Sequence, residues 1–280
     1  MEFENILKEF PVLPRISTRV CSSRLESIRP VRVILFDIYD TLVSSPKGDL
    51  ESQLTDSREE VYSFIATARM FGFSEEVGRI WSNMFFAKIE EEQRFCHSLG
   101  ITRAEVLVER IWHDLLLAVG GSPDVLSPYH LALYREMVAN PVALFEGVDV
   151  ILTILKERGF CLGLASNSQF YTLPILSRLL GRDIDTLFDP RWCFLSYKLG
   201  FAKPDPHFFR LVRIQALRCG LEPREVVMIG NDLENDIQAA IMHGLQAVHF
   251  LAQGISQGIS PSSKVVRIRN LKSLLNLKLS

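Results

Sequence analysis

Hydrophobic residues change their spacing twice along this chain, and each change marks a different kind of structure. Residues 31–36 form a short, continuous apolar run that stops abruptly at Asp37, which is typical of a buried strand. From about residue 49 to residue 140 the apolar residues recur at helical spacing, without strand patterns. After Pro141, short apolar runs alternate again with helical segments. The pattern therefore predicts a helical insert within an alternating α/β chain.

The limits of the predicted elements come from capping, proline and glycine residues at their ends. In the insert we predict helices over residues 57–71, 75–99, 104–119 and 128–138. Beyond it we predict helices over residues 148–158, 173–180 and 206–219, and one through Ala239 and Ala240 that ends at Gly244. The strands predicted there are residues 160–165, 192–195, 226–229, 247–251 and 265–268. A tandem Gln-Gly-Ile-Ser repeat within residues 253–260 predicts a surface loop.

Strands that alternate with helices predict a parallel sheet that helices cover on both faces. We therefore predict an α/β fold, a Rossmann-like doubly wound parallel sheet, with an all-helical cap inserted after the first strand. The predicted division is an N-terminal extension over residues 1–30, a core over residues 31–48 and 141–280, and the cap over residues 49–140. Within the N-terminal extension we predict a short helix followed by irregular, proline-containing chain.

Composition narrows the class of protein. Hydrophobic residues make up 48% of the chain, and 31 basic side chains nearly balance 33 acidic ones, so no basic excess indicates a nucleic-acid partner. The apolar runs are too short to span a bilayer, and the charged first ten residues lack the core of a secretory signal. Five cysteines stand singly, without a paired motif, which favours reduced thiols. We expect a cytoplasmic globular protein that binds neither membrane nor nucleic acid.

Polar side chains gather where the predicted strands end. Because ligands bind at the carboxyl ends of parallel strands, these positions are the candidates for chemistry. They are Asp37, Ser166, Asn167, Lys203, Asp232 and Asp236. Each has an ordinary alternative: a turn aspartate, a helix cap, or acids at the start of a helix. Asp205 and Pro206 after Lys203 likewise fit a helix cap and its first residue. Four such groups at four successive strand ends are poorly explained by these alternatives.

The arrangement resembles the haloacid dehalogenase superfamily of hydrolases. The resemblance runs from Val31 to about Phe250, and the helical insert is similar to that superfamily's C1-type cap. It rests on three phrases and on Lys203 between the second and third; the phrases are Asp37-Ile38-Tyr39-Asp40-Thr41-Leu42, Ser166-Asn167-Ser168-Gln169-Phe170 and Gly230-Asn231-Asp232-Leu233-Glu234-Asn235-Asp236. A poorly characterised subgroup has similar second and third phrases.

The resemblance implies a hydrolase with an aspartate nucleophile, most simply a Mg²⁺-dependent phosphatase of a small phosphorylated metabolite. Asp37 would attack phosphorus, and Ser166, Asn167 and Lys203 would bind the phosphate, with Ser166 and Lys203 also catalytic. The Mg²⁺ ligands would be Asp37, the backbone carbonyl of Tyr39, Asp232 and Asp236, the last bound directly or through water. A cation there also explains how several carboxylates can lie together.

Two residues depart from the usual pattern of the superfamily's phosphatases. Tyr39 stands where most of them carry a second aspartate, a general acid and base, and 2-haloacid dehalogenases also place an aromatic residue there. Asp40 stands where glycine is usual, and we interpret it as a residue that tolerates left-handed backbone. Two alternatives therefore stay open: a 2-haloacid dehalogenase, in which Asp37 attacks carbon without a metal, and a catalytically weak binding or regulatory protein. For the six histidines we expect surface or capping roles.

Overall fold

The structure is a computed structural model, and it describes residues 2–18, 27–48, 58–251 and 265–279 of the chain. The prediction for the Gln-Gly-Ile-Ser repeat falls outside these residues. Within them, no helix is long and apolar enough to cross a membrane.

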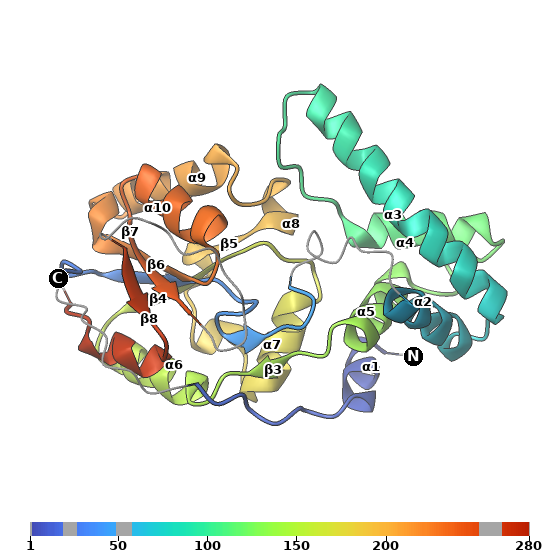
Figure 1. Ribbon diagram of the computed structural model, residues 1–280, viewed down its shortest axis with the longest axis horizontal. Coiled ribbons are helices and arrows are strands. Elements are labelled where there is room, and N and C mark those ends of the chain that lie inside the picture. Colours follow the sequence, from blue (N-terminus) through green and yellow to red (C-terminus); the bar gives the residue numbers. More distant parts are fainter. Residues whose placement is uncertain (1, 19–26, 49–57, 252–264, 280) are drawn as a thin grey trace.

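A six-stranded parallel sheet forms the centre of the larger half of the molecule (Figure 1). In spatial order its strands are β5 (Cys193–Leu195), β4 (Cys161–Ser166), β1 (Val33–Phe36), β6 (Val226–Gly230), β7 (Gln246–Phe250) and β8 (Val266–Ile268). The chain runs from β1 outward through β4 and β5, and then returns to β6 on the opposite side of β1. The carboxyl end of β1 therefore lies at the point where the strand order reverses, which is where open α/β sheets bind ligands.

Helices cover both faces of the sheet, as the doubly wound prediction requires. Side chains of β1 alternate between two cores: Ile34 and Phe36 pack into one, and Val33 and Leu35 into the other. The first core is closed by α6 (Val148–Glu157) and α7 (Thr172–Leu180), and the second by α9 (Pro206–Arg218) and α10 (Ala239–Met242). A single turn of π-helix, η5 (Leu233–Gln238), precedes α10, and a short helix, α8 (Ser196–Leu199), follows β5. This confirms the predicted fold class.

The insert is a group of helices beside the sheet (Figure 1). Its members are α2 (Arg58–Met70), α3 (Glu75–Ser98), α4 (Val108–Ala118) and α5 (Pro128–Ala139). Their aromatic core includes Phe64, Trp81, Phe85 and Trp112, all fully buried, and the buried Arg135 guanidinium lies over the Phe64 and Phe85 rings. The two chain segments that connect this group to the sheet pair with each other as the antiparallel strands β2 (Val43–Ser44) and β3 (Ala143–Leu144).

The limits of most elements agree with the predictions to within one or two residues. The predicted helix over residues 104–119 starts four residues late, because Ala104 forms an antiparallel bridge with Phe201 and the Glu105 amide donates to the Gly200 carbonyl. Hydrogen bonds to a distant segment thus hold residues 104–107 in an extended conformation, although the spacing of their apolar residues favours a helix. The remaining described elements are the N-terminal α1 (Phe3–Glu9) and four 3₁₀ segments, η2 (Ile184–Thr186), η3 (Pro190–Trp192), η4 (Pro223–Glu225) and η6 (Leu271–Asn276).

Candidate active site

Asp37 is the residue at the reversal point of the sheet. Its amide donates to the Ile229 carbonyl of β6 at 2.9 Å, which continues the parallel pairing one residue past β1. The side chain is buried, with a residue exposure of 6%. One carboxylate oxygen, Oδ1, accepts a hydrogen bond from Lys203 Nζ at 2.8 Å. The other, Oδ2, has no hydrogen-bond donor among the residues that the structure describes, so its lone pairs are not used by those residues.

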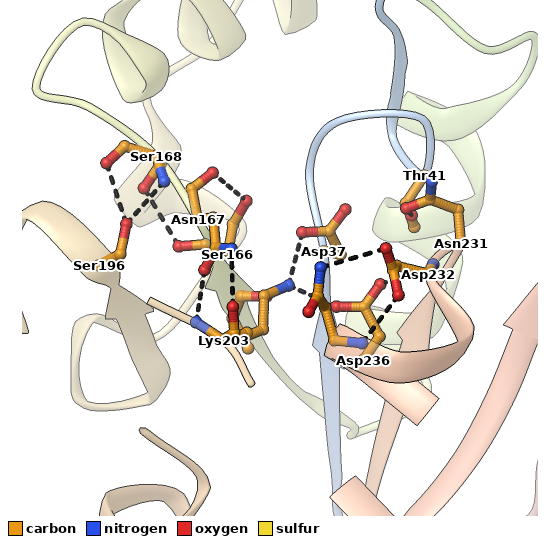
Figure 2. A network of polar contacts seen from close by, with 12 residues as sticks. Asp37, Thr41, Ser166, Asn167, Ser168, Ser196, Lys203, Asn231, Asp232 and Asp236 are labelled. Carbon is orange, nitrogen blue, oxygen red and sulfur yellow. Dashed lines mark hydrogen bonds and ion pairs between the residues drawn. The ribbon is translucent and has the colours of Figure 1, made fainter. Parts of the chain in front are cut away.

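Lys203 links three of the strand ends through its amine. Besides Asp37 it donates to the Ala165 carbonyl at the end of β4 and to Asp236 Oδ1 in η5 (Figure 2). Burial alone would lower the pKa of Lys203, but the carboxylates of Asp236 and Asp37 outweigh it and raise that pKa. Burial raises the pKa of Asp236 to about 7; the Asp37 carboxylate adds to this rise, and the charged Lys203 amine opposes it. The Lys203 amine stays charged, and it fixes the orientation of the Asp37 carboxylate.

Asn167 holds the backbone of Lys203 rather than pointing at a ligand. Its Nδ2 donates to the Lys203 carbonyl at 3.1 Å, and its Oδ1 accepts from the Lys203 amide at 2.7 Å. Ser166 is fully buried, and its Oγ donates to the Asn167 carbonyl at 3.2 Å. Next to them, the Ser168 amide donates to Ser196 Oγ at 2.8 Å. These hydrogen bonds hold the loop after β4 against Ser196, the residue that follows β5, and against the loop that carries Lys203.

The loop after β6 brings Asp232 and Asp236 to the same edge. Asp232 caps η5, because its Oδ1 accepts from the Glu234 and Asn235 amides at 2.8 Å each. Asp236 reaches back under this loop, and its Oδ2 accepts from the Asp232 amide at 3.0 Å. Gly230 makes room for it: a Cβ there would lie 2.2 Å from Asp236 Oδ2, closer than any real contact. The Asp232 carboxylate lies at the site, while the Asp236 oxygens serve Lys203 and this loop.

The side chains of the two unusual residues after Asp37 both form hydrogen bonds within the protein. The Tyr39 hydroxyl pairs with Thr172 Oγ1 at 3.0 Å in a buried contact. Asp40 has a φ of +55°, which confirms that it occupies the left-handed backbone expected for glycine. Its Oδ1 accepts a hydrogen bond from the Ser45 amide at 2.9 Å. In this arrangement neither side chain is directed at the proton chemistry of the missing aspartate.

A polar cavity of about 100 Å³ collects most of the predicted site. Its lining includes Asp37, Tyr39, Asn167, Lys203, Asp232 and Asp236, together with Asp40, Asn231 and Asn235. Ser166 does not line it. The volume is about that of three waters, which suits a hydrated ion or a phosphate group. Among the described residues, no three His, Cys, Asp or Glu side chains converge as a ready-made metal site. The donors are nevertheless the carboxylate and carbonyl oxygens that Mg²⁺ prefers, with room for its waters.

Several residues with supporting roles were missed by sequence reasoning, although most stand within the quoted phrases. Asn231 accepts from Thr41 Oγ1 at 3.3 Å, and its carbonyl contacts His249 Nε2 at 2.8 Å. His249 is buried in β7, so the expected surface role for this histidine is wrong. Gln169 donates to Glu105 and to the Val106 carbonyl, which ties the loop after β4 to the helical insert. Asn231 and Gln169 stand within the motif phrases, so the sequence did mark them as candidates. Their roles were not predictable, because their partners lie far away in sequence.

Comparison with known proteins decides the family. The pattern of the haloacid dehalogenase-like hydrolase family matches residues 31–244, which is most of the chain. The protein is a haloacid dehalogenase-like hydrolase. Among curated relatives of this hydrolase, phosphoserine phosphatase from Thermus thermophilus is 27% identical over 168 residues, which span 59% of this chain and 63% of that protein. Glyceraldehyde 3-phosphate phosphatase from Methanopyrus kandleri is 26% identical over 234 residues, 82% of this chain and 88% of that one.

Solved structures support the fold of the hydrolase in the same way. A HAD phosphatase from Thermococcus onnurineus superposes with a TM-score of 0.54 at 22% identity, over 89% of this chain and all of that one. A 2-haloacid dehalogenase from Pseudomonas syringae pv. Tomato DC3000 gives the same TM-score and identity, over 88% of this chain and 96% of that one. The fold therefore occurs in both phosphatases and dehalogenases, and the choice between these activities depends on the site.

Proposed function

We propose that this hydrolase is a Mg²⁺-dependent phosphatase of a small phosphorylated metabolite, with Asp37 as its nucleophile. The helices α2–α5 act as the cap over the site in this proposal. The observation that carries it is the charge of the 100 Å³ cavity: among the described residues, Asp37, Asp40, Asp232 and Asp236 line it, against one cation, Lys203. Such a cavity repels an anionic substrate unless a further cation binds first, and oxygen-rich surroundings select a hard divalent ion. The phosphatase relatives are consistent with this chemistry.

Asp37, the backbone carbonyl of Tyr39 and Asp232 would hold the ion, and Asp236, whose oxygens accept from Lys203 and from the Asp232 amide, would contact it through bound water. Bound there, Mg²⁺ would supply positive charge to the nucleophile and to the phosphate. Asp37 Oδ2, which has no donor among the described residues, attacks phosphorus. The bond from phosphorus to the ester oxygen breaks, and that oxygen leaves with its electron pair and takes a proton from solvent. Water then cleaves the aspartyl phosphate, releasing inorganic phosphate and restoring Asp37.

Lys203 has two tasks in this proposal. Its Nζ holds Asp37 Oδ1 at 2.8 Å, which leaves the other oxygen directed to the substrate. Because the amine is buried and remains charged, it also stabilises negative charge that develops on the phosphoryl oxygens. Asn167 acts as a positioning residue through its paired hydrogen bonds to the Lys203 backbone. Backbone amides of the loop after β4 would bind the phosphate, and Ser166, which is fully buried and bonds the Asn167 carbonyl, would join them only after its hydroxyl turns toward the cavity.

Dehalogenation of a 2-haloacid is the second candidate, and Tyr39 is the observation that favours it. In that reaction Asp37 attacks carbon, halide leaves, and water cleaves the resulting ester. A dehalogenase has no use for a cation, however, and the carboxylates of Asp232 and Asp236 beside Asp37 would then oppose binding of a negatively charged haloacid. We therefore rank the phosphatase first.

A screen of phosphorylated metabolites with and without Mg²⁺ tests the proposal. We expect phosphate release that EDTA abolishes, and a loss of about 10³-fold or more in Asp37→Asn, because the nucleophile is removed. Asp124→Asn, an exposed aspartate in the helical insert, is the matched control and should keep full activity. Halide released from 2-chloropropionate in the presence of EDTA, without turnover of any phosphate ester, would replace the phosphatase with the dehalogenase.

A further inference from the structure

Two further cavities lie in line with the cavity at Asp37. A narrow one of about 30 Å³ shares Tyr39 and Asn167 with it, and lies between the sheet and the helical insert. This middle cavity in turn shares Gln93, Ala104 and Ala202 with an outer one of about 440 Å³. Since each shares lining residues with the next, the three lie in a row from Asp37 to the surface. A substrate whose phosphate lies at Asp37 would extend along this row.

The charge changes sign along this row of cavities. The middle cavity is lined by polar and apolar side chains and by two carboxylates, Glu105 and Glu136, without a lysine or arginine among its described residues. Glu105 accepts from Gln169 Nε2 at 2.8 Å, and Glu136 accepts from the Tyr171 hydroxyl at 3.1 Å. Neutral groups such as hydroxyls fit there better than anions do. Among the described residues, the outer cavity is lined by Arg94 and Arg103 and by one acid, Glu90.

Arg103 is held at a fixed place relative to Lys203. Its carbonyl accepts from the Ala202 amide at 2.8 Å, and Ala104 next to it bridges Phe201. Thr102 Oγ1 also donates to Asp205 Oδ2 at 3.4 Å. The segment that carries Arg103 is therefore bonded along the segment that carries Lys203. These hydrogen bonds set the separation of the two backbone segments, and none of them involves α3.

We propose that the substrate carries a second negative group, a carboxylate or phosphate, which Arg94 and Arg103 bind in the outer cavity. This rests on the proposed phosphatase function and specifies its substrate: a small phosphorylated acid with an uncharged, polar middle. Guanidinium groups suit the task because their planar donors match the paired oxygens of carboxylate and phosphate. The two arginines belong to different elements, α3 and the segment before α4, so a bound anion would also join them.

Matched substrates measure this second site. Carboxyalkyl phosphates with chains of two to six carbons are compared with alkyl phosphates of the same lengths. We expect the carboxylates to be preferred in kcat/KM at one chain length, which reports the distance between the two anion sites. In Arg94→Ala and Arg103→Ala the preference should fall roughly tenfold each, the size expected for a partly exposed charge-assisted hydrogen bond. Arg79→Ala, an arginine about 22 Å away along α3, is the control that should keep it.

The outcomes separate this inference from the phosphatase itself. Equal turnover of both series, or an equal loss on both series in the arginine variants, would leave a phosphatase whose arginines only attract anions to the surface. If neither series is hydrolysed, binding to Asp37→Asn in the presence of Mg²⁺, measured by calorimetry, decides the matter. Tighter binding of the carboxylates that is lost in Asp37→Asn/Arg103→Ala supports the second site without the hydrolysis, and equal binding overturns it.

Discussion

At the scale of single residues, Tyr39 is the side chain that most affects the chemistry. Its hydroxyl is paired with Thr172 in a buried contact, and the carboxylate of the neighbouring Asp40 bonds the Ser45 amide. Neither is directed at a leaving group, whereas the aspartate usual at position 39 would donate a proton to it. The proposed reaction then depends on how well the leaving group carries negative charge. Substrates with poor leaving groups should be hydrolysed slowly.

Tyr39→Asp should therefore raise kcat on an alkyl phosphate by about 10- to 100-fold, toward the contribution of a general acid. On p-nitrophenyl phosphate, whose leaving group needs no proton, the rise should be much smaller. Steady-state kinetics with both substrates measure the difference, and Thr172→Ala is the control, because it removes the partner of the Tyr39 hydroxyl without adding an acid. An equal effect on both substrates in a folded variant would show that position 39 does not limit proton transfer.

At the scale of elements, the spacing of apolar residues was enough to predict the strands and helices, because a buried strand and an amphipathic helix each have their own period. The strand ends then placed Asp37, Lys203 and Asp232 at one edge of the sheet. The start of α4 was not predictable, since it depends on hydrogen bonds to the distant segment at Gly200 and Phe201. The π-helical turn of η5 was not predicted either. The partners of Asn167 and Asp236 were missed for the same reason: these side chains bond residues that only the fold brings near.

The strands on one side of the sheet also set the reactivity of two thiols. Cys161 begins β4 and Cys193 begins β5, and burial raises the pKa of each to about 11. Because the thiolate is the reactive form, at pH 8 each should react with iodoacetamide about a hundredfold more slowly than an ordinary exposed thiol. The exposed Cys219 serves as the internal reference. Mass spectrometry of single sites should show the two rates rising about tenfold per pH unit up to pH 11; labelling of all three at one rate would contradict this.

At the scale of the whole molecule, residues 2–18 connect the helical insert to the sheet. Helix α1 packs on α5, with Ile6 fully buried, and the Phe3 ring lies 6.1 Å from Phe170 in the loop after β4. The chain then follows the other half of the molecule, where Ile16 bridges Phe145 and Arg15 pairs with Asp149 of α6. One segment thus contacts both halves, on the side away from the outer cavity. Any motion that separates the halves has to break some of these contacts.

The apolar contacts should contribute much more to this connection than the ion pair. Ile6→Ala should lower the free energy of unfolding by about 2–5 kcal/mol, because it leaves a cavity in a packed core. Arg15→Ala should lower it by less than about 1 kcal/mol, since the Arg15 side chain is 45% exposed and solvent screens the pair.

The Arg15–Asp149 pair should also depend on pH. The hydrogen bond from Arg15 lowers the pKa of Asp149 in the folded protein. Its stabilisation is therefore complete above the pKa of Asp149 in the unfolded chain, and it is lost as the pH falls through the pKa of Asp149 in the folded protein. Denaturant titrations at neutral and acid pH should show the Arg15 effect vanish in acid while the Ile6 effect persists. A larger effect from Arg15 than from Ile6 at neutral pH would mean that the segment is held by charge and not by packing.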